Sequence, residues 1–369
     1  MNIRHPMTLP TPLQVPTQDD KLARARELFA LKLRAKIDPR IVPCAVTVEL
    51  DGGAGARGAV VRGYTAFPQT DAFTRRLAEE TFAPADVRFE LEVLWRDRPL
   101  AFAEVSGYAA PFYKTRTVSA PDLVTEALCG AVVRVFQTVD GWMLAQHHDG
   151  YVGWVPAGHL APVGHDRYLR WKNGRCGIVT ESRPGAKPET ALPLGACVVA
   201  EGDDLVMADG TRIAGDPTWI RFVEPASSGF GAHAEAVAAC FSTDSGGEDL
   251  ATPYLWGGKS QRGVDCSGFV QTLAQLAGIA LPRDASMQCY VGEMVGYLPD
   301  RGDLLAGDIV FFMNDNAFVY HVGVYLGEDM YLHSGGATGV TRSSFFPGGA
   351  GYSERYGDTF CFARRITVR

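Results

Sequence analysis

One cysteine and two histidines in the C-terminal third of the chain have the residue types of a nucleophile and its base. Cys266 stands in Val-Asp-Cys-Ser-Gly-Phe-Val, and His321 and His333 follow it in the sequence. Apolar residues at three- and four-residue steps after Cys266 predict a helix that begins at Asp265 or Cys266. Unpaired N–H groups and the positive end of the helix dipole favour a thiolate there, so we expect a lowered pKa for Cys266. This pattern indicates nucleophilic catalysis by a thiol with a histidine base.

The two histidines lie in a predicted β-hairpin whose strands flank the sequence Gly-Glu-Asp. If these three residues form the turn, His321 and His333 are diagonal neighbours on one sheet face, and Gly323 leaves space between them. A two-residue turn at Glu328 and Asp329 would put the histidines on opposite faces instead. On one face, His321 can take the thiol proton while His333 orients its ring.

The sequence around these residues resembles the NlpC/p60 family of cell-wall cysteine peptidases. The resemblance covers roughly residues 232–365. It implies a papain-like α+β catalytic domain in which Cys266 is the nucleophile, His321 the base and His333 the third polar residue. The segments that carry it, in the family's order, are Tyr254-x-Trp-Gly-Gly, Asp265-Cys-Ser-Gly-Phe-Val, Pro282-Arg-Asp, Gly307-Asp-Ile-Val-Phe-Phe, His321-Val-Gly-Val-Tyr and Leu332-His-Ser.

The whole chain is long enough for several domains, and its pattern predicts an α+β protein with five parts. Two stretches of short β-branched and aromatic runs resemble bacterial SH3-like domains, one around Asp149-Gly-Tyr-Val-Gly-Trp and a weaker one around Leu192-Pro-Leu-Gly. The predicted parts are a polar tail (1–20), an N-terminal helix with a small α+β unit (21–108), a first SH3-like barrel (109–163), a second SH3-like barrel (164–225) and the catalytic domain (226–369).

With two such barrels, the chain is similar to the branch of the family that hydrolyses the γ-D-glutamyl to diamino-acid bond of murein peptides with a free N-terminal L-Ala. In that branch the first barrel closes one end of the cleft, which makes the enzyme a dipeptidyl peptidase. The resemblance implies that Asp265 binds the terminal amine and that Tyr254 lies near the nucleophile. The other positions that match the substrate site are Arg283, Asp284, Ser267, Ser286, Tyr151 and Glu126.

Two features depart from the family pattern and bear on substrate fit. Many relatives carry Ser after Pro-Arg-Asp where this chain has Ala285, so Ser286 offers the nearest hydroxyl. A polar stretch at 242–252, predicted as an exposed loop, is longer than usual; it follows a predicted linker at 225–232 and a short predicted helix at 233–241. The diamino acid of the substrate could be diaminopimelate or lysine.

The composition restricts the class of partner. A net charge of −7 and a pI near 5.7 argue against binding to nucleic acids. No segment approaches the roughly 18 apolar residues of a membrane span. Eight cysteines without a Cys-x-x-Cys pair are expected to be free thiols, and the polar first residues carry no secretory signal. We therefore expect a cytoplasmic enzyme that acts on murein peptides and uses no metal or cofactor.

Plainer interpretations remain open at this point. The cysteine and the two histidines could bind zinc, although a structural zinc site wants a fourth ligand. Tyr151 could be barrel core, and Arg283 and Asp284 could pair at the surface. Rival functions are a general endopeptidase or amidase acting on intact peptidoglycan, a wall-binding protein without catalysis, and acyl transfer through the same thioester.

Overall fold

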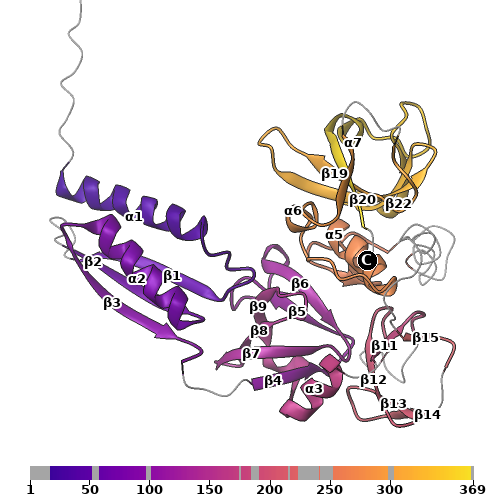
Figure 1. Ribbon diagram of the computed structural model, residues 1–369, viewed down its shortest axis with the longest axis horizontal. Helices are drawn as coiled ribbons and strands as arrows, with labels where there is room; N and C mark the ends of the chain where they lie inside the picture. The colour runs from indigo at the N-terminus through magenta and orange to yellow at the C-terminus, as the bar shows by residue number, and fades with distance from the viewer. Residues whose placement is uncertain are drawn as a thin grey trace, which may run out of the picture. The chain divides into compact units, whose positions relative to one another are not determined.

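The computed structural model describes residues 17–51, 58–96, 101–173, 176–183, 191–214, 217–222, 241, 252–297 and 303–366 (Figure 1). Most of the predicted tail, the linker at 225–232, all but the last residue of the helix at 233–241 and nearly all of the loop at 242–252 lie outside the described residues. Among the residues described, no helix combines the length and the apolar character that crossing a membrane requires. The chain divides into two compact units, residues 1–98 and 99–369.

The N-terminal unit is a three-stranded sheet whose core includes residues of two helices. Its elements are α1 (Gln18–Arg34), β1 (Cys44–Asp51), β2 (Gly58–Thr65), α2 (Pro68–Phe82) and β3 (Asp86–Val93). β1 pairs antiparallel with β2, and β2 pairs parallel with β3 through the crossover helix α2. Phe29 of α1 and Phe82 of α2 meet in the core, with ring centroids 6.0 Å apart. The predicted α+β character of this unit is confirmed.

The second unit begins with a seven-stranded sheet in the order β10-β4-β7-β8-β9-β5-β6, with antiparallel neighbours throughout. The domain boundary predicted after residue 108 is wrong, because β4 hydrogen-bonds with both β7 and β10 and adds Ala103 and Val105 to the same core. Asp140 and Gly141, both with positive φ, form the tight turn that joins β7 to β8. The strands are β4 (Ala101–Val105), β5 (Ala109–Tyr113), β6 (Leu123–Leu128), β7 (Val132–Val139), β8 (Trp142–Gln146), β9 (Val152–Pro156) and β10 (Leu160–Val163), with 3₁₀ turns at Ala120–Asp122 and Ala157–His159.

A helix, α3 (His165–Asn173), separates this sheet from a second one. The second SH3-like copy was predicted to include this segment, but Tyr168 of α3 stacks on Phe102 of β4 with ring centroids 4.1 Å apart. The helix therefore packs on the first sheet, and the second sheet begins only at Cys176. Its strands lie in the antiparallel order β14-β13-β12-β11-β15 and are β11 (Cys176–Val179), β12 (Cys197–Glu201), β13 (Asp204–Val206), β14 (Arg212–Ala214) and β15 (Ile220–Phe222).

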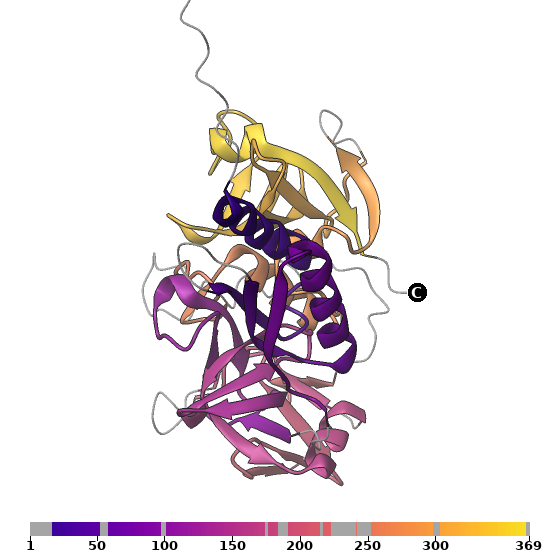
Figure 2. The same ribbon diagram turned by 90° about the vertical axis from the view of Figure 1, so that its left-hand side faces the viewer.

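The C-terminal part places one central helix against a six-stranded antiparallel sheet (orange to yellow in Figures 1 and 2). Helix α5 (Cys266–Leu276) is buried on nearly all sides, and its Phe269 and Leu273 share a core with Phe311 and Val324 of the sheet. This sheet has the order β18-β23-β19-β20-β21-β22. The remaining elements are β16 (Lys259–Ser260), β17 (Gly263–Val264), α6 (Ala285–Gln288), β18 (Glu293–Tyr297), β19 (Ile309–Met313), β20 (Val319–Gly327), β21 (Met330–Gly335), β22 (Gly339–Ser344), α7 (Glu354–Thr359) and β23 (Phe360–Arg365).

Candidate active site

The hairpin formed by β20 and β21 decides where the two histidines point. It closes with a two-residue turn, because Glu328 and Asp329 both have positive φ, 51° and 57°. A β-bulge at Leu326 then shifts the strand register by one residue. The shift puts His321 and His333 on the same face, with Nε2 of His321 2.9 Å from Nδ1 of His333. The expected pairing of the histidines is present, although the turn is the one that was expected to separate them.

Hydrogen bonds around the histidines leave Nδ1 of His321 outside the contact between the two rings. Nε2 of His333 lies 2.9 Å from Oγ of Ser343 on β22. If the proton of His321 sits on Nε2 and is donated to Nδ1 of His333, then His333 carries its own proton on Nε2 and donates it to Ser343. Nδ1 of His321 is then left as an acceptor.

In the part of the chain that is described, no three His, Cys, Asp or Glu side chains are grouped so as to hold a metal ion.

Cys266 is the first residue of α5, as the sequence predicts, and Asp265 is its N-cap. The backbone N–H groups of Val322 and Ser267 lie near enough to the sulfur to favour its charged form, and Val322 is the residue next to His321. The thiol therefore lies against the strand that carries the base. Ser334 on β21 holds this arrangement from the other side, because its hydroxyl donates to the carbonyl of Val264 at 2.7 Å.

The expectation of a lowered pKa for Cys266 is wrong for this structure. Burial, and after it the neighbouring Asp265 carboxylate, raise the pKa of the thiol to about 12, although the two backbone N–H groups act in the opposite direction. Desolvation disfavours the charged form of a buried thiol, and here it outweighs the favourable helix terminus. Cys266 is thus a neutral thiol at rest, and its proton must leave during the attack.

The two histidines are suited to that transfer because they are neutral as well. Burial, and then the neighbouring His333 and Arg355, hold the pKa of His321 well below its usual range. Burial lowers the pKa of His333 to about 4. A neutral imidazole has a free lone pair, so His321 can accept the thiol proton over the whole physiological pH range.

Two tyrosines enclose the thiol and the base. Tyr356 of α7 stacks on His321 with ring centroids 4.5 Å apart and meets the ring of His333 edge-on at 5.0 Å. Tyr254 precedes α5, and burial followed by the proximity of Cys266 raises the pKa of its hydroxyl. Sequence reasoning found Tyr254 but missed Tyr356 and the Ser343 partner of His333. Neither of the missed residues lies in a recognisable motif, so only the folded sheet brings them to the site.

Arg283 is the most heavily bonded side chain at this site. Its guanidinium donates to both oxygens of Asp265 at 2.9 and 2.7 Å, to Oγ of Ser267 at 2.9 Å and to the carbonyl of Gly258 at 3.3 Å. The remaining Nε–H donates at 2.8 Å to Oγ1 of Thr125, which lies in β6 of the first sheet. All five N–H donors of a guanidinium are therefore engaged. Arg283 links the first sheet to the N-cap of the nucleophile helix. The alternative that Arg283 merely pairs with Asp284 at the surface is wrong, because Arg283 is buried.

The carboxylate of Asp265 is correspondingly occupied. Besides Arg283 it accepts the N–H groups of Gly257 at 2.8 Å and Gly268 at 2.7 Å, and the hydroxyl of Ser267 at 3.3 Å. A carboxylate offers about four lone-pair positions, so a substrate ammonium would have to share an oxygen with one of these donors. Asp265 and Ser267 are both buried and first of all shape the start of α5.

Two further predicted residues come from the first sheet and reach the same region. The hydroxyl of Tyr151 donates to Asp284, the N-cap residue of α6, at 3.2 Å. Glu126 on β6 accepts a hydrogen bond from the backbone N–H of Lys259 at 2.8 Å, and burial raises the pKa of its carboxyl. Ser286 is half-buried in α6. The structure thus brings residues of the first sheet next to the start of α5, as the family resemblance implied.

Two parts of the chain match known protein families in sequence. The NlpC/P60 family profile matches residues 251–356, and that of the bacterial dipeptidyl-peptidase SH3 domain matches residues 117–160. A γ-D-glutamyl-L-lysine dipeptidyl-peptidase from Bacillus cereus is 28% identical over 239 residues, which cover 58% of this chain and 68% of that protein. A probable endopeptidase NlpC homolog from Haemophilus influenzae is 37% identical over 121 residues, and the match spans 32% of this chain and only 58% of that protein's length.

The fold has a solved counterpart. The crystal structure of an NlpC/P60 family protein from Bacillus cereus superposes with a TM-score of 0.58, covering 73% of this chain and 99% of that chain at 21% identity. At that identity the likeness concerns the fold. The sequence matches assign the domains: residues 251–356 form an NlpC/P60 domain, and residues 117–160 belong to a bacterial dipeptidyl-peptidase SH3 domain.

Proposed function

We propose that this chain hydrolyses the γ-D-glutamyl to diamino-acid bond of short murein peptides that carry a free N-terminal L-Ala, releasing L-Ala-γ-D-Glu. The observation that supports it most directly is the attachment of the first sheet at the nucleophile. Thr125 bonds to Arg283, and Tyr151 bonds to Asp284, on either side of one peptide link. An SH3 domain held there limits the length of peptide that can extend past Cys266. Relatives that bear the name dipeptidyl-peptidase support the same assignment.

The proposed reaction begins with transfer of the Cys266 proton to Nδ1 of His321 as the sulfur attacks the γ-carbonyl carbon of D-Glu. The tetrahedral intermediate collapses to a thioester, and the leaving amine of the diamino acid takes the proton from His321. Water then attacks the thioester, its proton passes to His321, and the thiol is restored when the dipeptide carboxylate leaves. His333 holds the ring of His321 through each of these transfers.

Two groups can donate a hydrogen bond to the oxyanion in this proposal. The backbone N–H of Cys266, at the first position of α5, makes no hydrogen bond to any of the residues described. The hydroxyl of Tyr254 remains protonated because burial raises its pKa. One donor of this kind is typically worth about 3 kcal/mol of transition-state stabilisation. We assign both donors to the γ-carbonyl oxygen.

The terminal ammonium of the substrate is assigned to the acids beside Arg283. Asp265 supplies a negative charge, although its oxygens are shared with other donors. Burial raises the pKa of Glu126. A substrate ammonium beside it would favour the ionised form, so Glu126 gains the most from binding the ammonium. A free amino group on the substrate is therefore part of the recognition that we propose, rather than an accidental feature of it.

Acetylation of the substrate tests this assignment. We expect L-Ala-γ-D-Glu-L-Lys, or the diaminopimelate equivalent, to release L-Ala-γ-D-Glu in an assay by mass spectrometry. N-acetyl-L-Ala-γ-D-Glu-L-Lys should react at least about a hundred-fold more slowly, because acetylation removes the positive charge that the buried acids would bind and adds bulk. Equal rates for the two peptides would contradict the dipeptidyl assignment and favour the general endopeptidase activity suggested by the Haemophilus influenzae relative's name.

Replacement of Tyr356 tests whether its ring positions and shields the base. Tyr356→Leu removes the stack on His321 and opens the ring to water, so the lowered pKa of His321 should rise toward its usual value. We expect the acid limb of kcat/KM to move to higher pH and kcat to fall about ten-fold. Tyr356→Phe keeps the ring and should retain the unmodified pH profile. An unchanged acid limb in the Leu variant would show that the ring only fills space.

A further inference from the structure

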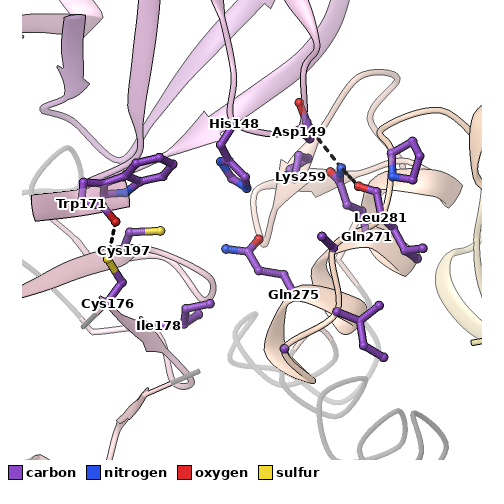
Figure 3. A pocket seen from close by; sticks show the side chains of 14 residues that line it. His148, Asp149, Trp171, Cys176, Ile178, Cys197, Lys259, Gln271, Gln275 and Leu281 are labelled. Carbon is purple, nitrogen blue, oxygen red and sulfur yellow. Dashed lines mark hydrogen bonds between the residues drawn. The ribbon is translucent and has the colours of Figure 1, made fainter. Parts of the chain in front are cut away.

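A second site lies on another part of α5, away from the thiol. It is a cavity of about 520 Å³ where the first sheet, α3, the second sheet and the C-terminal part meet. Cys266 is not among the residues that line it, and Gln271 and Gln275 of α5 are. Figure 3 shows Trp171 and Cys197 on one side and Lys259 with Gln271 on the other. Cavities of this size ordinarily accommodate small organic ligands.

Lys259 is a buried cation in the wall of this cavity. The residue is 2% exposed. The carboxylates of Asp149 and Glu126 lie close enough to raise its pKa, but no described residue is shown in a hydrogen bond or ion pair with its ammonium. The nearby carboxylate of Asp149 accepts hydrogen bonds from Tyr151 N–H at 2.9 Å and from Nε2 of Gln271 at 2.9 Å, and Nδ1 of His147 lies 3.0 Å from it. Burial lowers the pKa of Lys259 to about 8, so it is still mostly charged at neutral pH. A buried cation in this position calls for an anionic partner.

Gln271 presents the complementary polar group. Its Nε2 donates to Asp149 and to the carbonyl of Leu281, while its Oε1 is buried and accepts no hydrogen bond from the described residues. A buried carbonyl oxygen without a donor is costly, and a ligand N–H would satisfy it. The other walls are largely apolar and include Trp171, Ile178 and Leu281.

We propose that this cavity binds a small molecule with a carboxylate for Lys259, a neighbouring N–H for Oε1 of Gln271 and an apolar body for the remaining walls. Free and N-acylated amino acids with aliphatic side chains have this chemistry. The site is separate from the peptidase reaction, since Cys266, His321 and His333 are not among the residues that line it. Residues 278–282 line it and lead directly to Arg283, so a bound ligand also stabilises the segment that anchors the N-cap of α5.

Calorimetric titration of the full chain tests the proposal with N-acetyl-L-leucine as the probe. N-acetyl-L-leucinamide is its neutral match, and 4-methylpentanoate keeps the carboxylate but lacks the N–H. We expect N-acetyl-L-leucine to bind at least about ten-fold more tightly than either of the other two. Lys259→Met, which keeps the length of the side chain, should abolish that preference, and Lys172→Met, an exposed lysine on α3, should leave it intact.

The unmodified protein provides a second test that does not depend on a variant that folds. Because the cation is lost above a pKa of about 8, the dissociation constant of N-acetyl-L-leucine should rise about ten-fold for each pH unit beyond it. The affinity for N-acetyl-L-leucinamide should not change over the same range. Equal binding of acid and amide, a pH-independent affinity for the acid, or no binding of the acid at millimolar concentration would each overturn the proposal.

Discussion

Cys266→Ala is expected to reduce release of L-Ala-γ-D-Glu by at least about four orders of magnitude, because no other group at the site can form the thioester. The residual rate would come from the oxyanion donors and the bound geometry alone. The fold should persist, since a buried cysteine behaves as a small apolar residue and alanine occupies less space at the same position. Mass spectrometry of the peptide products gives the rate, and circular dichroism gives the fold.

Cys361→Ala serves as the matched control for this loss. Cys361 lies in β23 of the same domain and is half-buried, but it belongs to neither the thiol environment nor the histidine pair. Its replacement should leave turnover within about two-fold of the unmodified chain. If Cys266→Ala kept a tenth or more of the activity while Cys361→Ala behaved as expected, another nucleophile would have to be sought and the mechanism would be wrong.

Arg283→Met is expected to destabilise the second unit by about 3–5 kcal/mol, the usual cost of leaving one partner of a buried ion pair uncompensated. The variant leaves the buried carboxylate of Asp265 without its cationic partner and removes the donors to Ser267 and Thr125. Peptidase activity should fall as well, because the N-cap of the nucleophile helix loses its support. Urea unfolding followed by tryptophan fluorescence measures the stability, and the dipeptide assay measures the activity.

Two further variants test whether the arrangement of the guanidinium donors of Arg283 matters more than its positive charge. Arg283→Lys keeps the charge but supplies three donors from one point, so most of the destabilisation should remain. Arg212→Met removes an exposed arginine that pairs with Glu201 and Asp204, and it should cost less than about 1 kcal/mol. A loss below about 1 kcal/mol for Arg283→Met would mean that the interactions seen around it contribute little to stability.

The sequence predicts the nucleophile helix and the histidine hairpin well because both depend on local patterns. Apolar spacing after Cys266 places the start of α5 correctly, with Asp265 as its cap. The hairpin prediction offers two registers, and local rules do not choose between them. The structure uses a bulge at Leu326, which becomes favourable only when the two strands sit in a sheet with a buried face.

Features that arise from tertiary packing could not be predicted in this way. The pKa of Cys266 depends on how deeply α5 is buried, and the local argument from the helix dipole gave the wrong direction. Tyr356 reaches His321 from an element near the end of the chain, and Thr125 reaches Arg283 from the first sheet. Strand β4 was likewise assigned to the wrong unit, since its place is decided by pairing with β7 and β10.

The bulge at Leu326 makes this hairpin sensitive to chain length in an all-or-none manner. Side chains alternate between the two faces of a strand, so a change of one residue moves a whole strand from one face to the other. A substitution near the tip can weaken the contact between His321 and His333 by degrees. An insertion or deletion of one residue has only two outcomes. Either the bulge absorbs it and the two imidazoles stay together, or one imidazole moves to the opposite face of the sheet.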